Sequence, residues 1–148
     1  MTRESRRLAG IILILVPAVA FGGASLLSMI LGEVPGYLDN ALRQDLWRAG
    51  HAHAGVLIVL SLVLLRYVDE AALSGRWRWL GRSGVPIAAI LMPAGFFLSV
   101  LTPEATRPNP LIALVPLGGL FLIAGVLTVG IGLLRTPPPA EGVAASGG

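Results

Sequence analysis

Long apolar runs separated by short polar segments dominate this chain of 148 residues. Four runs contain no Asp, Glu, Lys or Arg: 8–32, 49–65, 84–101 and 111–134. A helix needs roughly 20 residues, with a lower limit of about 17, to cross the hydrocarbon core of a bilayer. Because backbone polar groups in lipid must be satisfied within the segment, each run is expected to be a helix. The pattern predicts an all-α, integral membrane four-helix bundle with spans at about 8–32, 47–66, 84–102 and 111–134, and a disordered tail over 136–148.

Small residues at four-residue spacing predict where these helices touch, because they let helix backbones approach closely in a membrane. The expected contact ridges are Ala20 and Ala24 in the first helix, Gly50 and Ala54 in the second, Gly84 and Ala88 in the third, and Ala124, Thr128 and Gly132 in the fourth.

Composition agrees with a membrane protein, since 55% of the residues are hydrophobic and 13% are charged, against about 25% charged in an average soluble domain. A net charge of +3 would suggest nucleic acid in a soluble protein, but the positions of the arginines indicate topology instead. By the positive-inside rule, the arginine-rich segments face the cytoplasm. Both termini are therefore expected to be cytoplasmic. The cytoplasmic arginines are Arg3, Arg6, Arg7, Arg66, Arg76, Arg78, Arg82 and Arg135, and the outer ones are Arg43, Arg48 and Arg107.

Every basic residue is arginine, which is typical of a GC-rich bacterial genome, so we expect a bacterial plasma membrane protein. The absence of cysteine excludes disulfides, iron–sulfur ligation and thiol catalysis. The sequence Arg76-Trp77-Arg78-Trp79 is expected in a cytoplasmic loop, where it would anchor the chain at the lipid headgroups.

The two histidines, His51 and His53, are the natural candidates for chemistry, because imidazole binds metals and heme and exchanges protons near neutral pH. They lie near the start of the second apolar run. Residues i and i+2 of a helix project about 200° apart, so one metal ion cannot bind both histidines on a regular helix. His51 shares its face with small residues and is expected to point into the bundle, whereas His53 shares a face with Leu57, Leu60 and Leu64 and is expected to meet lipid, a partner subunit or an inserted cofactor.

A cofactor site would need further ligands. Zinc and copper sites use three or four ligands, and the outer layer offers only scattered carboxylates. Met29, near the outer end of the first helix, could complete a His-Met site for copper or heme b, although it is also typical of packing. Met92 is another candidate for the methionine of a His-Met heme.

The segment His53-Ala54-Gly55-Val56-Leu57-Ile58, preceded by Arg48, resembles the second helix of the catalytic subunit of heme-copper oxidases. In that family a histidine near the outer face ligates the low-spin heme, and the resemblance implies this role for His53, with His51 as the alternative register. The family's other ligands come from later helices, and no histidine follows His53 here. The resemblance covers about twenty residues and implies no oxygen reduction or proton pumping. The chain also resembles small four-helix bacterial membrane proteins of unassigned function.

The first functional hypothesis is a non-catalytic accessory or orphan membrane protein whose histidine pair interlocks the outer ends of its helices. The alternative is a heme- or metal-binding protein related to redox chemistry, and the second alternative is a small transporter or pH-responsive channel. Transport is disfavoured because the spans lack a mid-membrane carboxylate or arginine. Hydrolysis ranks last, because the serines have no adjacent base. The lipid bilayer is the expected partner, together with further copies of the chain or subunits of a respiratory complex; no nucleic acid is expected.

Overall fold

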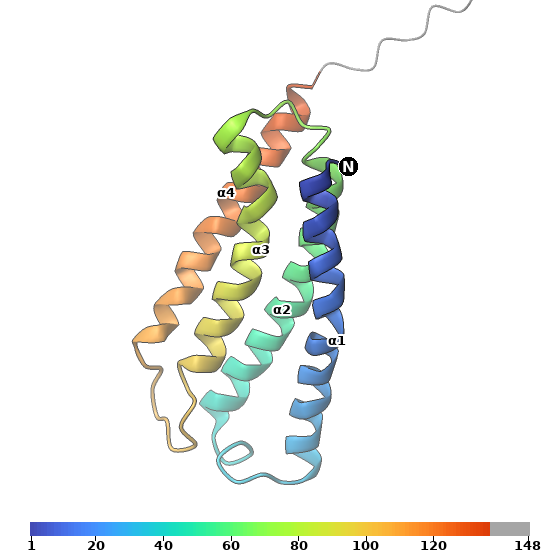
Figure 1. The fold of residues 1–148 in the computed structure, drawn as a ribbon. Coiled ribbons are helices and arrows are strands. Elements are labelled where there is room, and N and C mark those ends of the chain that lie inside the picture. Colours follow the sequence, from blue (N-terminus) through green and yellow to red (C-terminus); the bar gives the residue numbers. More distant parts are fainter. Residues whose placement is uncertain (137–148) are drawn as a thin grey trace, which may run out of the picture.

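The computed structural model describes residues 1–136 and contains four long helices, each antiparallel to the one before it (Figure 1). Helix α1 spans Arg3–Leu31, α2 Ala41–Tyr67, α3 Gly75–Leu98 and α4 Leu114–Leu134, with a short 3-10 helix, η1, over Pro110–Ala113 before α4. All four are long and apolar enough to cross a membrane. The predicted all-α architecture is confirmed, whereas the tail predicted over 136–148 lies outside the described residues from 137 onward.

The helices follow one another through the bundle in chain order (Figure 1). Helix α2 packs between α1 and α3, and α3 packs between α2 and α4. Helices α1 and α4 therefore form the two edges. The N-terminus, the α2–α3 connection and the end of α4 lie at one end of the bundle, which we call the arginine-rich end (Figure 1).

Helix α3 begins earlier than the third apolar run. Its first turns contain Arg76, Trp77, Arg78 and Trp79, so the prediction that these residues form a loop is wrong. A helix continues past the hydrocarbon core because its backbone hydrogen bonds do not depend on apolar side chains, and Trp and Arg are suited to the interface that follows.

The predicted contact ridges are confirmed for α3 and in part for α2 and α4, where Ala54 and Ala124 are half-buried. Gly50, Gly84, Ala88, Thr128 and Gly132 are buried. The closest approach joins α3 and α4, where a Cβ atom added to Gly84 would lie 2.8 Å from the carbonyl oxygen of Phe121 and 2.9 Å from the Cα of Gly125. Only glycine fits between backbones this close.

The ridge predicted for the first helix is wrong. Ala20 and Ala24 are exposed, and α1 instead turns Gly22 and Gly23 toward His51 of α2. Consecutive glycines leave a flatter patch than alanines, so the helix contact forms on the glycine side.

A polar cluster at the arginine-rich end ties α1 to the rest of the bundle. The Asp69 carboxylate, in the α2–α3 connection, accepts hydrogen bonds from the backbone N–H of Thr2 at 2.6 Å, the Ser5 hydroxyl at 3.0 Å and the Thr2 hydroxyl at 3.2 Å. Arg82 of α3 lies 3.4 Å from Asp69 and 3.5 Å from Glu4, and its Nε donates to Ser5 at 3.1 Å. The ion pair of Asp69 and Arg82 therefore links three segments: the start of α1, the α2–α3 connection and α3.

The hydrogen bonds decide the protonation of Asp69. Burial raises the pKa of this carboxyl, but the bonds from Thr2, Ser5 and Arg82 together outweigh burial and hold the pKa below its ordinary value. A carboxylate whose pKa is depressed by folding stabilises the folded state above the unfolded pKa, near 4, and the contribution is lost as the pH falls through the folded pKa.

We therefore expect Asp69→Asn to lower the free energy of unfolding at pH 7 by about 2 kcal/mol, the range of a hydrogen bond to a charged group. The gap between wild type and variant should close as the pH falls below about 4. This difference in the free energy of unfolding is measured by unfolding both proteins with a denaturing detergent in mixed micelles at several pH values, with circular dichroism as the signal. A gap that is constant with pH would contradict the assignment.

Candidate functional site

The two histidines flank the buried side of α2 near its N-terminal third. Asn40 caps this helix, its side chain accepting a hydrogen bond from the Arg43 N–H at 3.1 Å. Between the directions of the two rings lie the buried residues Gly50, Leu57 and Ser61. Both rings are half-buried.

His51 packs against the backbone of α1. A Cβ added to Gly23 would lie 2.8 Å from its Nε2, and a Cβ added to Gly22 would lie 3.7 Å from its Nδ1. The pair of glycines therefore forms a shallow seat for the imidazole. The sequence prediction that His51 points into the bundle agrees with this position.

His53 packs against α3. Its ring lies 5.0 Å from the ring of Phe96, centroid to centroid, with the planes tilted by 37°. Its Nδ1 lies 2.7 Å from the carbonyl oxygen of Ala49, one turn earlier. A carbonyl accepts only, so Nδ1 donates this hydrogen bond and Nε2 is the ring nitrogen not engaged in it.

The separation of the two histidines onto different faces is confirmed, because one ring contacts α1 and the other α3. The expectation that the leucine-rich face of α2 meets lipid is wrong: Leu57 is 3% exposed and belongs to the core with Val85, Ala88 and Met92. His53 packs against Phe96 of α3, and the expectation that it also meets lipid, a partner subunit or a cofactor stays a prediction. The physical reason is that α2 packs against both α1 and α3, so each histidine lies on a side that meets a neighbouring helix.

The two methionines proposed as ligands lie on helices other than α2. Met29 is half-buried on α1. Met92 is 8% exposed in the core, where it faces Gly118 of α4. In the part of the chain that the structure describes, no group of three or more His, Cys, Asp or Glu residues could hold a metal ion.

A residue that sequence reasoning treated only as an outer charge, Arg43, joins the loops at the end of the bundle near the histidines. Its guanidinium donates to three carbonyl oxygens: Gly36 at 2.8 Å, Leu101 at 3.0 Å and Val100 at 3.2 Å. It also lies 4.1 Å from the centroid of the Trp47 ring, within the range of a cation–π contact. Arg43 therefore holds the α1–α2 connection against the segment after α3.

Aromatic rings continue this contact inward. Trp47 lies 5.9 Å from Tyr37 and 6.0 Å from Phe97, centroid to centroid, and its indole N–H donates to the Phe97 carbonyl at 3.3 Å. Tyr37 is fully buried, and its hydroxyl has no partner among the described residues. No local pattern in the sequence predicts this cluster, because Tyr37, Trp47 and Phe97 lie in three separate segments of the chain.

Comparisons with protein-family models, with curated proteins and with solved structures found no match. The residues and their geometry therefore carry the functional argument.

The contact of His51 with α1 predicts a measurable coupling. We expect Gly23→Ala to lower the free energy of unfolding by about 1 kcal/mol or more through overpacking, and to lose most of this effect in the presence of His51→Ala. The interaction energy from the double-mutant cycle should lie within about 0.5–3 kcal/mol. Detergent unfolding of the four proteins measures it.

Gly10→Ala is the matched control. Gly10 lies on the same helix as Gly23, and a Cβ added there would meet no atom within 4 Å. A Gly23→Ala effect that persists unchanged without the imidazole would show that His51 does not pack on this glycine.

Proposed function

We propose that this protein is a non-catalytic accessory protein of the bacterial plasma membrane that binds another membrane protein through α1. The observation that supports the proposal is that polar and small side chains occupy different surfaces of the chain. The polar groups that could do chemistry hold the helices of this chain together, while Ala20, Ala24 and Ser28 of α1 are exposed.

Arg43, Asp69, Arg82 and His51 each have a partner within the described part of the chain. Arg43 binds three carbonyls, Asp69 and Arg82 form a hydrogen-bonded pair, and His51 packs on α1. Such use matches the first hypothesis from the sequence, that the histidines interlock helix ends.

Helix α1 buries little of itself. Its buried residues are Ser5, Ile12 and Leu26. Ala20, Ala24 and Ser28 are exposed at four-residue spacing on the side turned away from α2. The Ser28 hydroxyl donates a hydrogen bond to the backbone carbonyl of Ser25, within the same helix. Small residues at this spacing favour contact between membrane helices, because they let two helix backbones approach closely.

The orientation that we propose places both termini in the cytoplasm. Support comes from the gathering of eight arginines at the arginine-rich end, on the N-terminal segment, the end of α2, the start of α3 and the residue after α4: Arg3, Arg6, Arg7, Arg66, Arg76, Arg78, Arg82 and Arg135. The positive-inside rule then assigns this end to the cytoplasm. The partner is a further copy of the chain or a subunit of a respiratory complex.

The test is site-specific photo-crosslinking in intact cells. A photoreactive amino acid at Ala24 should form a discrete protein adduct, whereas the same group at Ala52, an exposed alanine of α2, should form none. Ala20→Ile should lower the Ala24 adduct about tenfold, which corresponds to about 1.4 kcal/mol of lost contact. Mass spectrometry of the adduct identifies the partner. Equal labelling at Ala24 and Ala52, or only lipid adducts, would refute the proposal.

A second candidate, heme binding, is favoured by one observation. The bond from the Nδ1 of His53 to Ala49 leaves Nε2 free in the manner of a metal-bound histidine. One chain offers a single such ligand, so the other would come from a second copy or a partner. A Soret band in the reduced-minus-oxidised spectrum of the crosslinked complex, lost in His53→Ala and kept in His51→Ala, would favour this candidate.

A further inference from the structure

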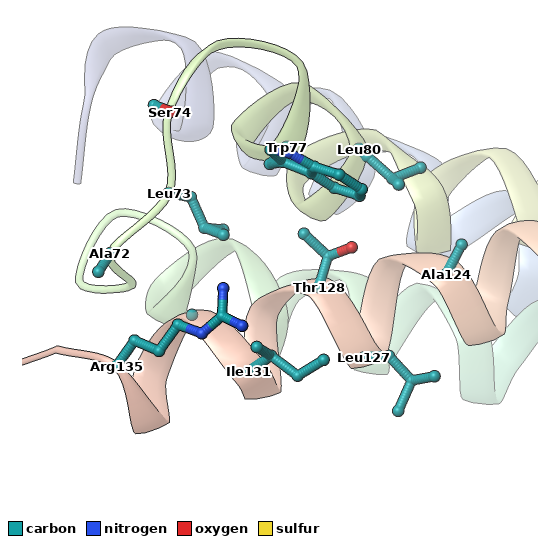
Figure 2. Close-up of a pocket in the computed structure, with 11 residues that line it drawn as sticks. Ala72, Leu73, Ser74, Trp77, Leu80, Ala124, Leu127, Thr128, Ile131 and Arg135 are labelled. Carbon is teal, nitrogen blue, oxygen red and sulfur yellow. The ribbon is translucent and has the colours of Figure 1, made fainter.

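A groove of about 540 Å³ lies at the arginine-rich end, far from the histidines, between the start of α3 and the end of α4 (Figure 2). Its lining includes Trp77 and Leu80 from α3 and Ala124, Leu127, Thr128 and Arg135 from the α4 side. Figure 2 shows the Trp77 ring across the groove from Thr128, with Arg135 at one end and Ala124 at the other.

The length of the groove matches one leaflet of a bilayer. Ala124 and Arg135 are eleven residues apart, which is about 16 Å along a helix that rises 1.5 Å per residue. Half of a hydrocarbon core of about 30 Å is about 15 Å. With Arg135 at the headgroup level, the inner end of the groove therefore lies near the bilayer midplane.

The chemistry of the groove changes along this length. Its inner part is lined by Leu80, Ala124 and Leu127, together with Thr128, whose side chain is buried. Its mouth carries the guanidinium of Arg135, which is exposed. A second cation stands nearby, because Arg76 lies 5.4 Å from the Trp77 ring centroid. An occupant that satisfies both parts has an anionic head and an apolar chain.

The acidic side chains that the structure describes at this end already have arginine partners. Glu4 and Asp69 lie within 4 Å of Arg82, and Glu70 pairs with Arg66. The described part of a second copy would therefore bring no free carboxylate to Arg135, whereas the headgroups around it would bring phosphate.

We propose that this groove binds one anionic phospholipid of the surrounding bilayer. The phosphate binds Arg135, and one acyl chain lies between Trp77 and Thr128 and reaches Ala124. The site is at the opposite end of the bundle from the histidines and is independent of the contact proposed for α1.

Native mass spectrometry of the full chain, released from detergent with equal amounts of phosphatidylglycerol and phosphatidylcholine, tests the proposal. Wild type should retain one phosphatidylglycerol in preference to phosphatidylcholine. Arg135→Gln should lower that retention about fivefold, the effect of one basic residue at an anionic surface, and Ala124→Trp should abolish it by filling the groove.

Two controls match these changes. Arg7→Gln removes an exposed arginine from the same end, and Gly130→Trp adds an indole to an exposed position of α4 where a Cβ meets nothing within 4 Å. Both should retain the lipid, and circular dichroism checks that all variants are folded. Equal retention of the two lipids, or equal losses in Arg135→Gln and Arg7→Gln, would overturn the proposal. A dimer that Ala124→Trp dissociates would also overturn it, because the groove would then hold a second copy.

Discussion

Close contact between helices at glycine is the constraint on which this structure depends. Gly84 and Gly125 bring α3 and α4 together, Gly50 admits Phe96 and Phe97 of α3 against α2, and Gly23 admits His51 against α1. In lipid, apolar side chains gain little by leaving the solvent, so packing between close backbones has to hold the helices together. Each neighbouring pair in the bundle has a contact at glycine: the backbones of α3 and α4 meet directly, whereas Gly50 and Gly23 receive side chains of the neighbouring helix.

Polar residues complete this arrangement at the two ends, where water is near. Arg43 joins the loops at one end, and Asp69 with Arg82 joins three segments at the other. Their cost of burial is offset by several hydrogen bonds each, which an isolated pair would not supply. The histidines belong to the same scheme, since each lies in a different helix interface. The surfaces left for partners are then the outward side of α1 and the groove between α3 and α4.

The number, type and approximate position of the helices could be predicted because an apolar run of bilayer length is a local property of the sequence. The start of α3 could not, since Arg76 to Trp79 are polar or interfacial although helical. The separate directions of His51 and His53 followed from helix geometry alone. Their partners did not, because which helix lies on each side of α2 depends on the whole bundle. Arg43 and Asp69 were missed for the same reason: their partners Val100 and Thr2 lie 57 and 67 residues away.

The most direct test compares two identical substitutions, Gly84→Ala and Gly119→Ala, by detergent unfolding in mixed micelles. A Cβ at Gly84 meets the backbone of α4 at 2.8 Å, where no rotamer change can relieve it, whereas a Cβ at Gly119 meets nothing within 4 Å. The account predicts that Gly84→Ala lowers the free energy of unfolding by about 1–3 kcal/mol and that Gly119→Ala leaves it unchanged or raises it slightly. Equal stability of the two variants would contradict it.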